Sequence, residues 1–142
     1  MKSIFWDTNL FIYLLEDSPQ FGQAVADLRR RMLHRNDRLF TSAMTVGEIL
    51  VKPLTTGNTV LADRYRALFK GHHLIVSPFD LGAAEAYANI RQNRSVSPAD
   101  AIQLACAESA QADLFITNDD RLTQKNIPGV SFFIASLTRA PV

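Results

Sequence analysis

The stretch A-D-L-F-I-T-N-D-D-R-L, residues 112–122, places an apolar run shortly before two adjacent carboxylates, with Thr117 and Asn118 between them. Residues 114–117 are predicted to form a buried strand, because the run is short, apolar and rich in residues that pack well in sheets. Asp119 and Asp120 follow at its carboxyl end. One acid there could cap a helix. Whether Asp119 and Asp120 have a functional role as well therefore depends on which other side chains lie near the end of this strand.

The rest of the chain alternates between short apolar strands and amphipathic or Ala-rich helices. The predicted strands are residues 3–6, 39–41, 74–76, 114–117 and 130–134. The predicted helices are residues 10–15, 20–35, 44–51, 59–70, 81–92 and 98–112. Apolar strands separated by helices are typical of a parallel sheet covered on both faces. We predict a single α/β domain over residues 1–142, a three-layer α/β/α fold with a mostly parallel sheet of about five strands.

Composition predicts a soluble, cytoplasmic protein. Hydrophobic residues make up 47% of the chain, charged residues 20%, and the net charge is +1. This balance is ordinary for a globular protein and indicates neither nucleic-acid nor membrane binding by bulk charge. The first apolar run breaks at Asp7, which makes a poor signal peptide, and no stretch approaches the length of a membrane span. The single Cys106 excludes an internal disulfide, and its context L-A-C-A predicts a small buried side chain.

Five acids fall at predicted strand ends or in the helices that follow them. Asp7 ends the first strand, and Asp119 and Asp120 follow the fourth. Glu48 lies after the second strand in T-V-G-E-I-L, and Asp100 lies at a helix start in S-P-A-D-A-I. In an open α/β sheet, ligands bind beyond the carboxyl ends of the strands. We therefore expect these side chains to share one edge of the sheet.

Each acid also has a purely structural explanation. Asp7 and Asp119 could cap helices, which is worth about 1 kcal/mol each. The segments T-V-G-E (45–48) and S-P-A-D (97–100) both have the spacing of a capping box. The acid of the first segment could also pair with Lys52, one turn further along the helix. Asp120, by contrast, could simply be solvated.

Taken together, four acids at helix starts favour a cation site. Ser or Thr would cap without adding charge, whereas like charges about 5 Å apart repel by roughly 3 kcal/mol per pair at an effective dielectric constant of about 20. Carboxylate oxygens without His or Cys select Mg²⁺ or Mn²⁺. His34, His72 and His73 lie outside any ligand motif and are expected to be surface or structural residues. Because unneutralised acids strain the metal-free protein, we expect Asp119→Asn to raise its melting temperature.

Four stretches, in order, resemble the successive motifs of PIN domains. They are F-W-D-T-N-L-F-I-Y-L-L-E, T-S-A-M-T-V-G-E-I-L, S-P-A-D-A-I-Q-L-A and A-D-L-F-I-T-N-D-D-R-L. The resemblance spans nearly the whole chain and implies a Rossmann-like sheet and a metal-dependent endoribonuclease. It also implies a VapC-type toxin of a type II toxin–antitoxin system. The partners it implies are an RNA substrate, a small cognate antitoxin and a second copy of the chain in a homodimer.

By position, the resemblance implies a catalytic and metal-binding tetrad of Asp7, Glu48, Asp100 and Asp119, with Mg²⁺ or Mn²⁺ as the cofactor. Asp7 and Asp119 are the expected direct ligands, and Glu48 and Asp100 would complete the site through water or orient the nucleophile. The ion would reverse the local charge, so that an anionic phosphodiester can be hydrolysed to 5′-phosphate and 3′-hydroxyl ends. The residues grouped around the tetrad are Asn9 and Thr117, expected to hold the carboxylates in place, and Asp120, whose role the resemblance leaves open.

Arginines near the tetrad are the expected RNA contacts. Arg91 and Arg94 lie just before the helix of Asp100, where they could hold phosphate near the site. Arg31 and Arg35 belong to the basic run L-R-R-R-M-L-H-R, which a solvated helix face would also explain. Arg121 could instead pair with the acids beside it.

Three alternatives stay open. The chain could be a housekeeping PIN nuclease that is not a toxin, or a non-catalytic RNA- or protein-binding PIN module. A phosphoryl-receiving signalling domain also has an acidic Mg²⁺ site on a doubly wound sheet, but it would need paired acids after the first strand and a Lys after the last. The first strand offers only Asp7, and S-F-F-I-A-S contains no Lys. A cleavage assay that depends on divalent ions separates the catalytic from the non-catalytic alternatives.

Overall fold

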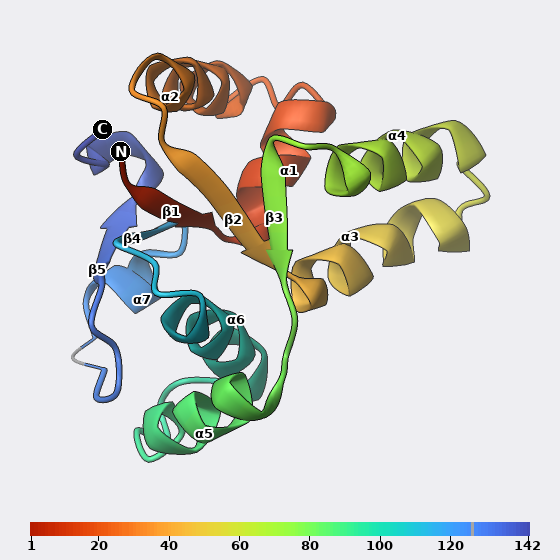
Figure 1. Ribbon diagram of the computed structural model, residues 1–142. Coiled ribbons are helices and arrows are strands. Elements are labelled where there is room, and N and C mark those ends of the chain that lie inside the picture. Colours follow the sequence, from red (N-terminus) through yellow and green to blue (C-terminus); the bar gives the residue numbers. More distant parts are fainter. Residues whose placement is uncertain (126) are drawn as a thin grey trace.

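A computed structural model describes residues 1–125 and 127–142 of the protein. Within this range β1 (Ser3–Trp6), β2 (Arg38–Ser42), β3 (Leu74–Ser77), β4 (Leu114–Thr117) and β5 (Phe133–Ser136) form a five-stranded sheet in the order β3-β2-β1-β4-β5. Every strand pairing is parallel. Helices cover both faces of the sheet (Figure 1). The predicted α/β/α architecture is therefore confirmed.

Helices connect the strands and end close to the predicted boundaries. They are α1 (Thr8–Leu15), α2 (Gly22–His34), α3 (Ala43–Thr55), α4 (Thr59–Lys70), α5 (Leu81–Ile90), α6 (Pro98–Ser109), α7 (Asp120–Thr123) and the 3-10 turn η1 (Leu137–Arg139). The prediction for α3 stopped at residue 51, whereas the helix continues through the buried Pro53 to Thr55. Neither α7 nor η1 was predicted, because both are too short to show a helical period.

The apolar strands supply two separate cores. Ile4 and Trp6 pack on the side of α1 and α2, whereas Phe5 between them packs on the side of α5 and α6. β4 divides in the same way, with Ile116 on the first side and Phe115 on the second. Successive side chains of a strand point to opposite faces of the sheet. A strand buried on both faces therefore needs apolar residues on both, which is why β1 and β4 show no alternation of apolar and polar residues apart from Ser3 and Thr117 at their ends.

The last strand differs from its prediction. β5 begins at Phe133, which lies opposite Leu114, the first residue of β4. Phe132 precedes the strand, is buried and stacks on Phe115 with ring centroids 6.0 Å apart. The prediction of a strand over residues 130–134 is wrong, because pairing with β4 sets the register of β5 and Phe132 turns into the core.

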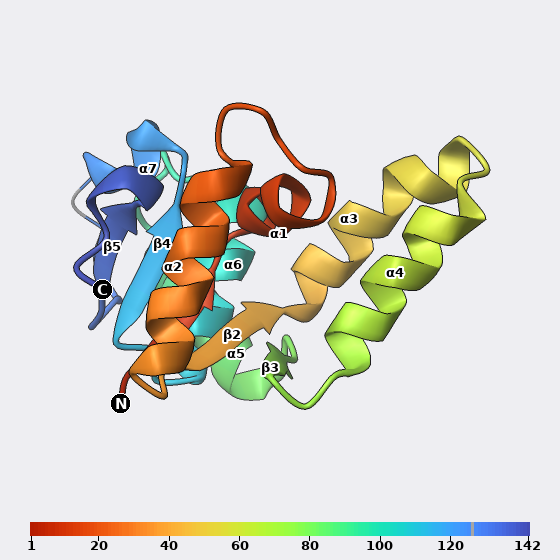
Figure 2. The ribbon, with the colours of Figure 1, turned by 90° about the horizontal axis from the view of Figure 1, so that it is seen from above.

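The strand order creates a switch point between β1 and β4. The chain first adds β2 and β3 on one side of β1, and then crosses the other face through α5 and α6 to place β4 on the opposite side. Connections therefore leave β1 and β4 in opposite directions, and the carboxyl ends of strands at such a switch point are where sheets of this kind bind ligands. α3 and α4 form a hairpin that extends past the β3 edge (Figures 1 and 2).

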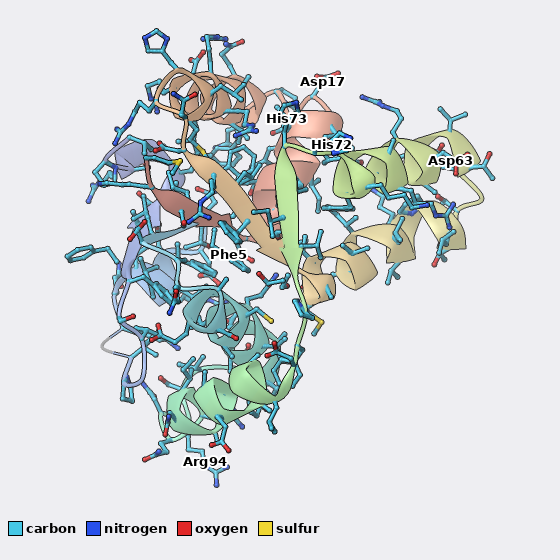
Figure 3. The ribbon with its side chains drawn as sticks, viewed as in Figure 1. Phe5, Asp17, Asp63, His72, His73 and Arg94 are labelled. Atoms are coloured by element: carbon cyan, nitrogen blue, oxygen red, sulfur yellow. The ribbon has the colours of Figure 1, made fainter. Side chains whose placement is uncertain are left out.

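Cys106 and the three histidines lie where the sequence predicted. Cys106 is buried in α6, and burial raises the pKa of its thiol to about 11, so the group serves as a core side chain. His34, His72 and His73 are exposed, and the last two lie at the start of β3 (Figure 3). No helix in the described ranges combines the length and the hydropathy that crossing a membrane requires.

Phe115→Ala should destabilise the protein strongly. The Phe115 ring is fully buried and stacks between those of Phe5 and Phe132, at 5.1 and 6.0 Å between centroids. We expect the free energy of unfolding to fall by about 3–5 kcal/mol, measured by urea denaturation. The matched control is Phe133→Ala, on the neighbouring strand, where the residue is 80% exposed. This control should change stability by less than about 0.5 kcal/mol, and equal losses for both variants would contradict the two-sided core.

Candidate active site

Asp7 directly follows β1 and is held on both carboxylate oxygens. Its backbone N–H donates to the carbonyl of Ile116 at 3.0 Å, which extends the pairing of β1 with β4 by one residue. Oδ1 accepts the N–H of Thr8 at 2.8 Å, and Oδ2 accepts the hydroxyl of Thr117 at 2.8 Å. Asp7 therefore caps α1, and its carboxylate is fixed beyond the carboxyl end of β1.

Thr117, the last residue of β4, connects two of the acids. Its hydroxyl donates to Asp7 and accepts the N–H of Asp119 at 3.0 Å. Asp119 then caps α7 by accepting the N–H of Arg121 at 3.0 Å. Because β1 and β4 are neighbours in the sheet, Asp7 and Asp119 lie at adjacent strand ends.

Arg121 supplies a positive charge to Asp119. Its Nε and Nη2 donate to Oδ1 and Oδ2 at 3.0 and 2.8 Å, and this pairing holds the pKa of Asp119 below its ordinary value. The sequence predicts that Asp119 is an unneutralised acid whose replacement by Asn stabilises the metal-free protein. The structure contradicts that expectation, because Arg121 compensates the charge.

Asp7 and Glu48 are the acids whose charge is poorly compensated. Burial raises the pKa of Asp7, and the carboxylates of Asp100 and Asp119 raise it further. Burial also raises the pKa of Glu48, with additional contributions from Asp7 and Asp100. In both cases hydrogen bonds to the carboxylate oppose the shift without reversing it. The four acids therefore share one electrostatic environment.

Glu48 reaches the site from the second turn of α3. This helix is capped by Ser42, whose Oγ accepts the N–H of Thr45 at 3.2 Å. The alternative of a capping box that starts at Thr45 is therefore excluded, because the helix begins before that residue and Ser42 is its cap. Glu48 accepts the hydroxyl of Thr8 at 3.2 Å, and the ion pairs of the described residues do not include one between Glu48 and Lys52.

Asp100 reaches the site from the first turn of α6. Ser97 caps this helix by accepting the N–H of Asp100 at 3.2 Å, and Pro98 occupies the first turn, as predicted. The cap is thus made by the serine hydroxyl. The Asp100 carboxylate is not needed for it, and its charge acts on both Asp7 and Glu48.

A buried polar residue that the sequence analysis did not single out adjoins these acids. Gln103 is only 3% exposed and contacts the hydroxyls of Ser42, Thr8 and Thr45. The signal that could have identified it is its position one turn after Asp100, on the face that α6 buries. A polar side chain on such a face needs buried partners.

Asn9 and Asp120, which we grouped with the tetrad, are both exposed. Asn9 lies in the first turn of α1, and Asp120 is the first residue of α7. Among the described residues, neither side chain forms a hydrogen bond with the four acids. A supporting role for these two residues stays a prediction.

The four arginines predicted to bind RNA are not gathered at the acids. Arg31 and Arg35 lie at the end of α2, next to the amino-terminal edge of the sheet, whereas the acids lie at its carboxyl edge. Arg91 donates to the carbonyl of Val96 at 2.7 Å within the α5–α6 loop. Arg94, in the same loop, is exposed and points outward (Figure 3). RNA contacts by these residues stay a prediction.

The donor set at the site suits a hard divalent cation. It consists of carboxylate oxygens, with neither His nor Cys among them. In the arrangement of the described residues, no three such side chains converge on one point closely enough to enclose an ion, and the Asp119 carboxylate is occupied by Arg121. A bound ion would neutralise the Asp119 carboxylate in place of Arg121. The Arg121 side chain is 80% exposed and is therefore free to move into solvent.

Comparisons with known proteins agree with this fold. A family model described as PIN domain matches residues 4–128. VapBC2 from Rickettsia felis is similar at a TM-score of 0.74 and 14% identity, covering 94% of this chain and 98% of that chain. VapBC-1 from nontypeable Haemophilus influenzae has a TM-score of 0.68 at 22% identity, covering 96% and 99%. No curated protein matches the chain.

A further solved structure is that of a toxin described by what it cleaves. VapC20 from Mycobacterium tuberculosis, described as a sarcin-ricin loop cleaving toxin, has a TM-score of 0.62 at 16% identity and covers 79% of this chain and 86% of that chain. Identities this low establish similarity of fold alone. The family model, however, spans most of the chain, and the observed sheet and the order of the motifs agree with it. The chain therefore belongs to the PIN domain family.

Proposed function

We propose that residues 1–142 form a single PIN domain that acts in the cytoplasm as a Mg²⁺- or Mn²⁺-dependent endoribonuclease, the toxin of a toxin–antitoxin pair. The observation that carries the proposal is that hydrogen bonds beside the switch point of the sheet connect Asp7 to Glu48 through Thr8. Thr117 connects Asp7 to Asp119 in the same way, and the charge of Asp100 acts on Asp7 and Glu48. Membership of the PIN family supports nuclease chemistry. The similarity to VapBC structures and to VapC20 supports RNA as the substrate and an antitoxin as a partner.

Each acid has a proposed role. Asp7 and Asp119 are the direct ligands of the ion, and Glu48 and Asp100 complete the site or orient the attacking water. When bound, the divalent ion supplies the positive charge that an anionic phosphodiester needs and the acidity that activates water. Thr117 connects the carboxylate of Asp7 to the backbone N–H of Asp119 through its hydroxyl, which fixes the start of α7 beside Asp7. Arg121, once displaced from Asp119, is available to an RNA phosphate beside the site.

The proposed protein partners are a small antitoxin and a second copy of the chain. An antitoxin that places an Arg or Lys among the acids would take the electrostatic place of the ion, as Arg121 does for Asp119 within the chain. The α3–α4 hairpin also exposes Val51, Leu54 and Val60, which are 62%, 57% and 72% exposed. Apolar side chains exposed together on one projecting element are typical of a surface that a partner covers.

Cleavage of a mixed RNA substrate should stop in EDTA and resume when Mg²⁺ or Mn²⁺ is added. Asp7→Asn and Asp119→Asn should each lower the rate by orders of magnitude, because each removes charge that binds the ion. The matched control is Asp80→Asn, which makes the same change at the cap of α5, where Asp80 accepts the N–H of Ala83 at 2.9 Å. The control should cleave like wild type. Undiminished cleavage by Asp119→Asn would refute the assigned site.

Asp7→Asn should melt at a higher temperature than wild type in EDTA at neutral pH. The raised pKa of Asp7 means that the ionised carboxylate is less favourable in the folded chain than in the unfolded one. This penalty is absent below about pH 4, the ordinary range of an unfolded Asp, and grows as the pH rises through the higher folded value. The advantage of the Asn variant should therefore shrink as the pH is lowered.

Divalent ions should reverse this order of melting temperatures. Wild type should gain stability as Mn²⁺ is added, because the ion binds the folded state, and Asp7→Asn should gain much less. Thermal melts of both proteins across pH, with EDTA and with Mn²⁺, give the comparison. A wild-type melting temperature that ignores Mn²⁺ would contradict the proposed metal site.

Expression of the chain alone in a bacterial host should arrest growth and degrade RNA, whereas the Asp7→Asn variant should be harmless at the same protein level. Growth curves and total RNA profiles measure both effects. Normal growth with the active enzyme would favour the housekeeping nuclease over the toxin, because a toxin expressed without its antitoxin stops growth and a housekeeping nuclease does not.

A further inference from the structure

One buried carboxamide joins three segments that carry the acids. Gln103 on α6 donates through Nε2 to the hydroxyl of Thr8 at 2.9 Å and to that of Thr45 at 2.7 Å. Its Oε1 accepts the hydroxyl of Ser42, the residue that caps α3. Ser42 and Thr45 are fully buried. α1, α3 and α6 are thus connected through a single side chain.

The hydrogen bonds run in one direction and end at Glu48. Because both Nε2 protons of Gln103 are donated to threonine hydroxyls, the proton of the Thr8 hydroxyl is available for another acceptor. That acceptor is Oε1 of Glu48, at 3.2 Å. The Thr45 hydroxyl lies 3.0 Å from that of Thr8 and can donate to it. If the amide were turned the other way, its oxygen would face Thr8 and would accept the proton of the Thr8 hydroxyl. Glu48 would then lose its donor.

The position of Gln103 on its helix links this network to a second acid. Gln103 lies three residues after Asp100, so the two side chains belong to the same side of α6. Gln103 also contacts Ser42 and Thr45, so the network joins the helix of Asp100 to the start of the helix that carries Glu48. A change at Gln103 would therefore alter the relation between α3 and α6 at the point where their acids interact.

We propose that Gln103 is a positioning residue for the carboxylate site, which acts through the Thr8 hydroxyl to hold Glu48 in the orientation that a divalent ion requires. This inference rests on the proposed function. Gln103 itself need not touch the ion or RNA, because Thr8 separates it from the carboxylate. Hydrogen-bond partners that orient the ligands of a metal typically contribute a factor of about 10–100 to metal affinity.

The test measures Mn²⁺ affinity of the folded protein without RNA, by electron paramagnetic resonance. Gln103→Leu removes the carboxamide at similar volume. Thr8→Val removes the hydroxyl but retains the backbone N–H that the Asp7 carboxylate accepts as the cap of α1. Each variant should bind Mn²⁺ roughly 10–100-fold more weakly. The double variant should bind no more weakly than the weaker single variant, because both changes interrupt the same connection.

The matched control is Thr41→Val. Thr41 is fully buried next to Ser42, and its hydroxyl donates to the carbonyl of Trp6 at 3.0 Å, outside the network of Gln103. This variant should lose thermal stability but bind Mn²⁺ like wild type. If the role of Gln103 were purely structural, Gln103→Leu would give this same result. Should Gln103→Leu fail to fold, Thr8→Val decides the question by itself.

Two outcomes would overturn the inference, and they are distinguishable. If wild type binds Mn²⁺ and cleaves RNA but Gln103→Leu and Thr8→Val bind Mn²⁺ as tightly, or if their effects add, Gln103 does not act through Thr8 and only this inference fails. If wild type itself neither binds Mn²⁺ nor cleaves RNA, the proposed function fails and the inference fails with it.

Discussion

The site depends on β1 being paired on both sides by parallel strands. β1 pairs with β2 and β4, and the ladder continues past its end, where the N–H of Asp7 donates to the carbonyl of Ile116. Parallel strands end at the same edge of a sheet, so the segments that follow β1, β2 and β4 emerge together. Without this pairing, residues as distant in sequence as Asp7 and Thr117 would have no reason to meet.

A second constraint is the charge collected at that edge. Asp119 is neutralised by Arg121, whereas the donors to Asp7 and Glu48 among the described residues are hydroxyls and a backbone N–H. Such donors orient a carboxylate and favour its charged form, but they leave its negative charge in place. The arrangement therefore keeps a local excess of negative charge, which a cation can relieve. In the proposed function, three cations compete for the carboxylates of this site: the side chain of Arg121, which pairs with Asp119, a divalent ion, and a basic side chain of the antitoxin.

The architecture and the positions of the acids could be predicted from local patterns. β1 and β4 have the predicted boundaries, because each is a short apolar run bounded by polar residues. The Ser97 cap with Pro98 after it also followed from local sequence. The errors arose where a partner decides the outcome. β5 takes its register from β4, and the cap of α3 is Ser42, the last residue of a strand whose end depends on pairing with β3.

The sequence by itself determined which chemistry is available: apolar strands that must be buried on both faces, acids after the ends of those strands, and no His or Cys among them. Only the tertiary structure decided how the acids are held. Gln103 and Thr8 are 95 residues apart, and Gln103 and Thr45 are 58 apart, yet each pair shares a hydrogen bond. The physical reason is that the spacing of apolar residues along a helix or strand shows which side is buried, and this can be recognised within one short segment. Hydrogen bonds between buried polar groups depend on the distances between elements, and these are set only when the sheet and its helices pack together.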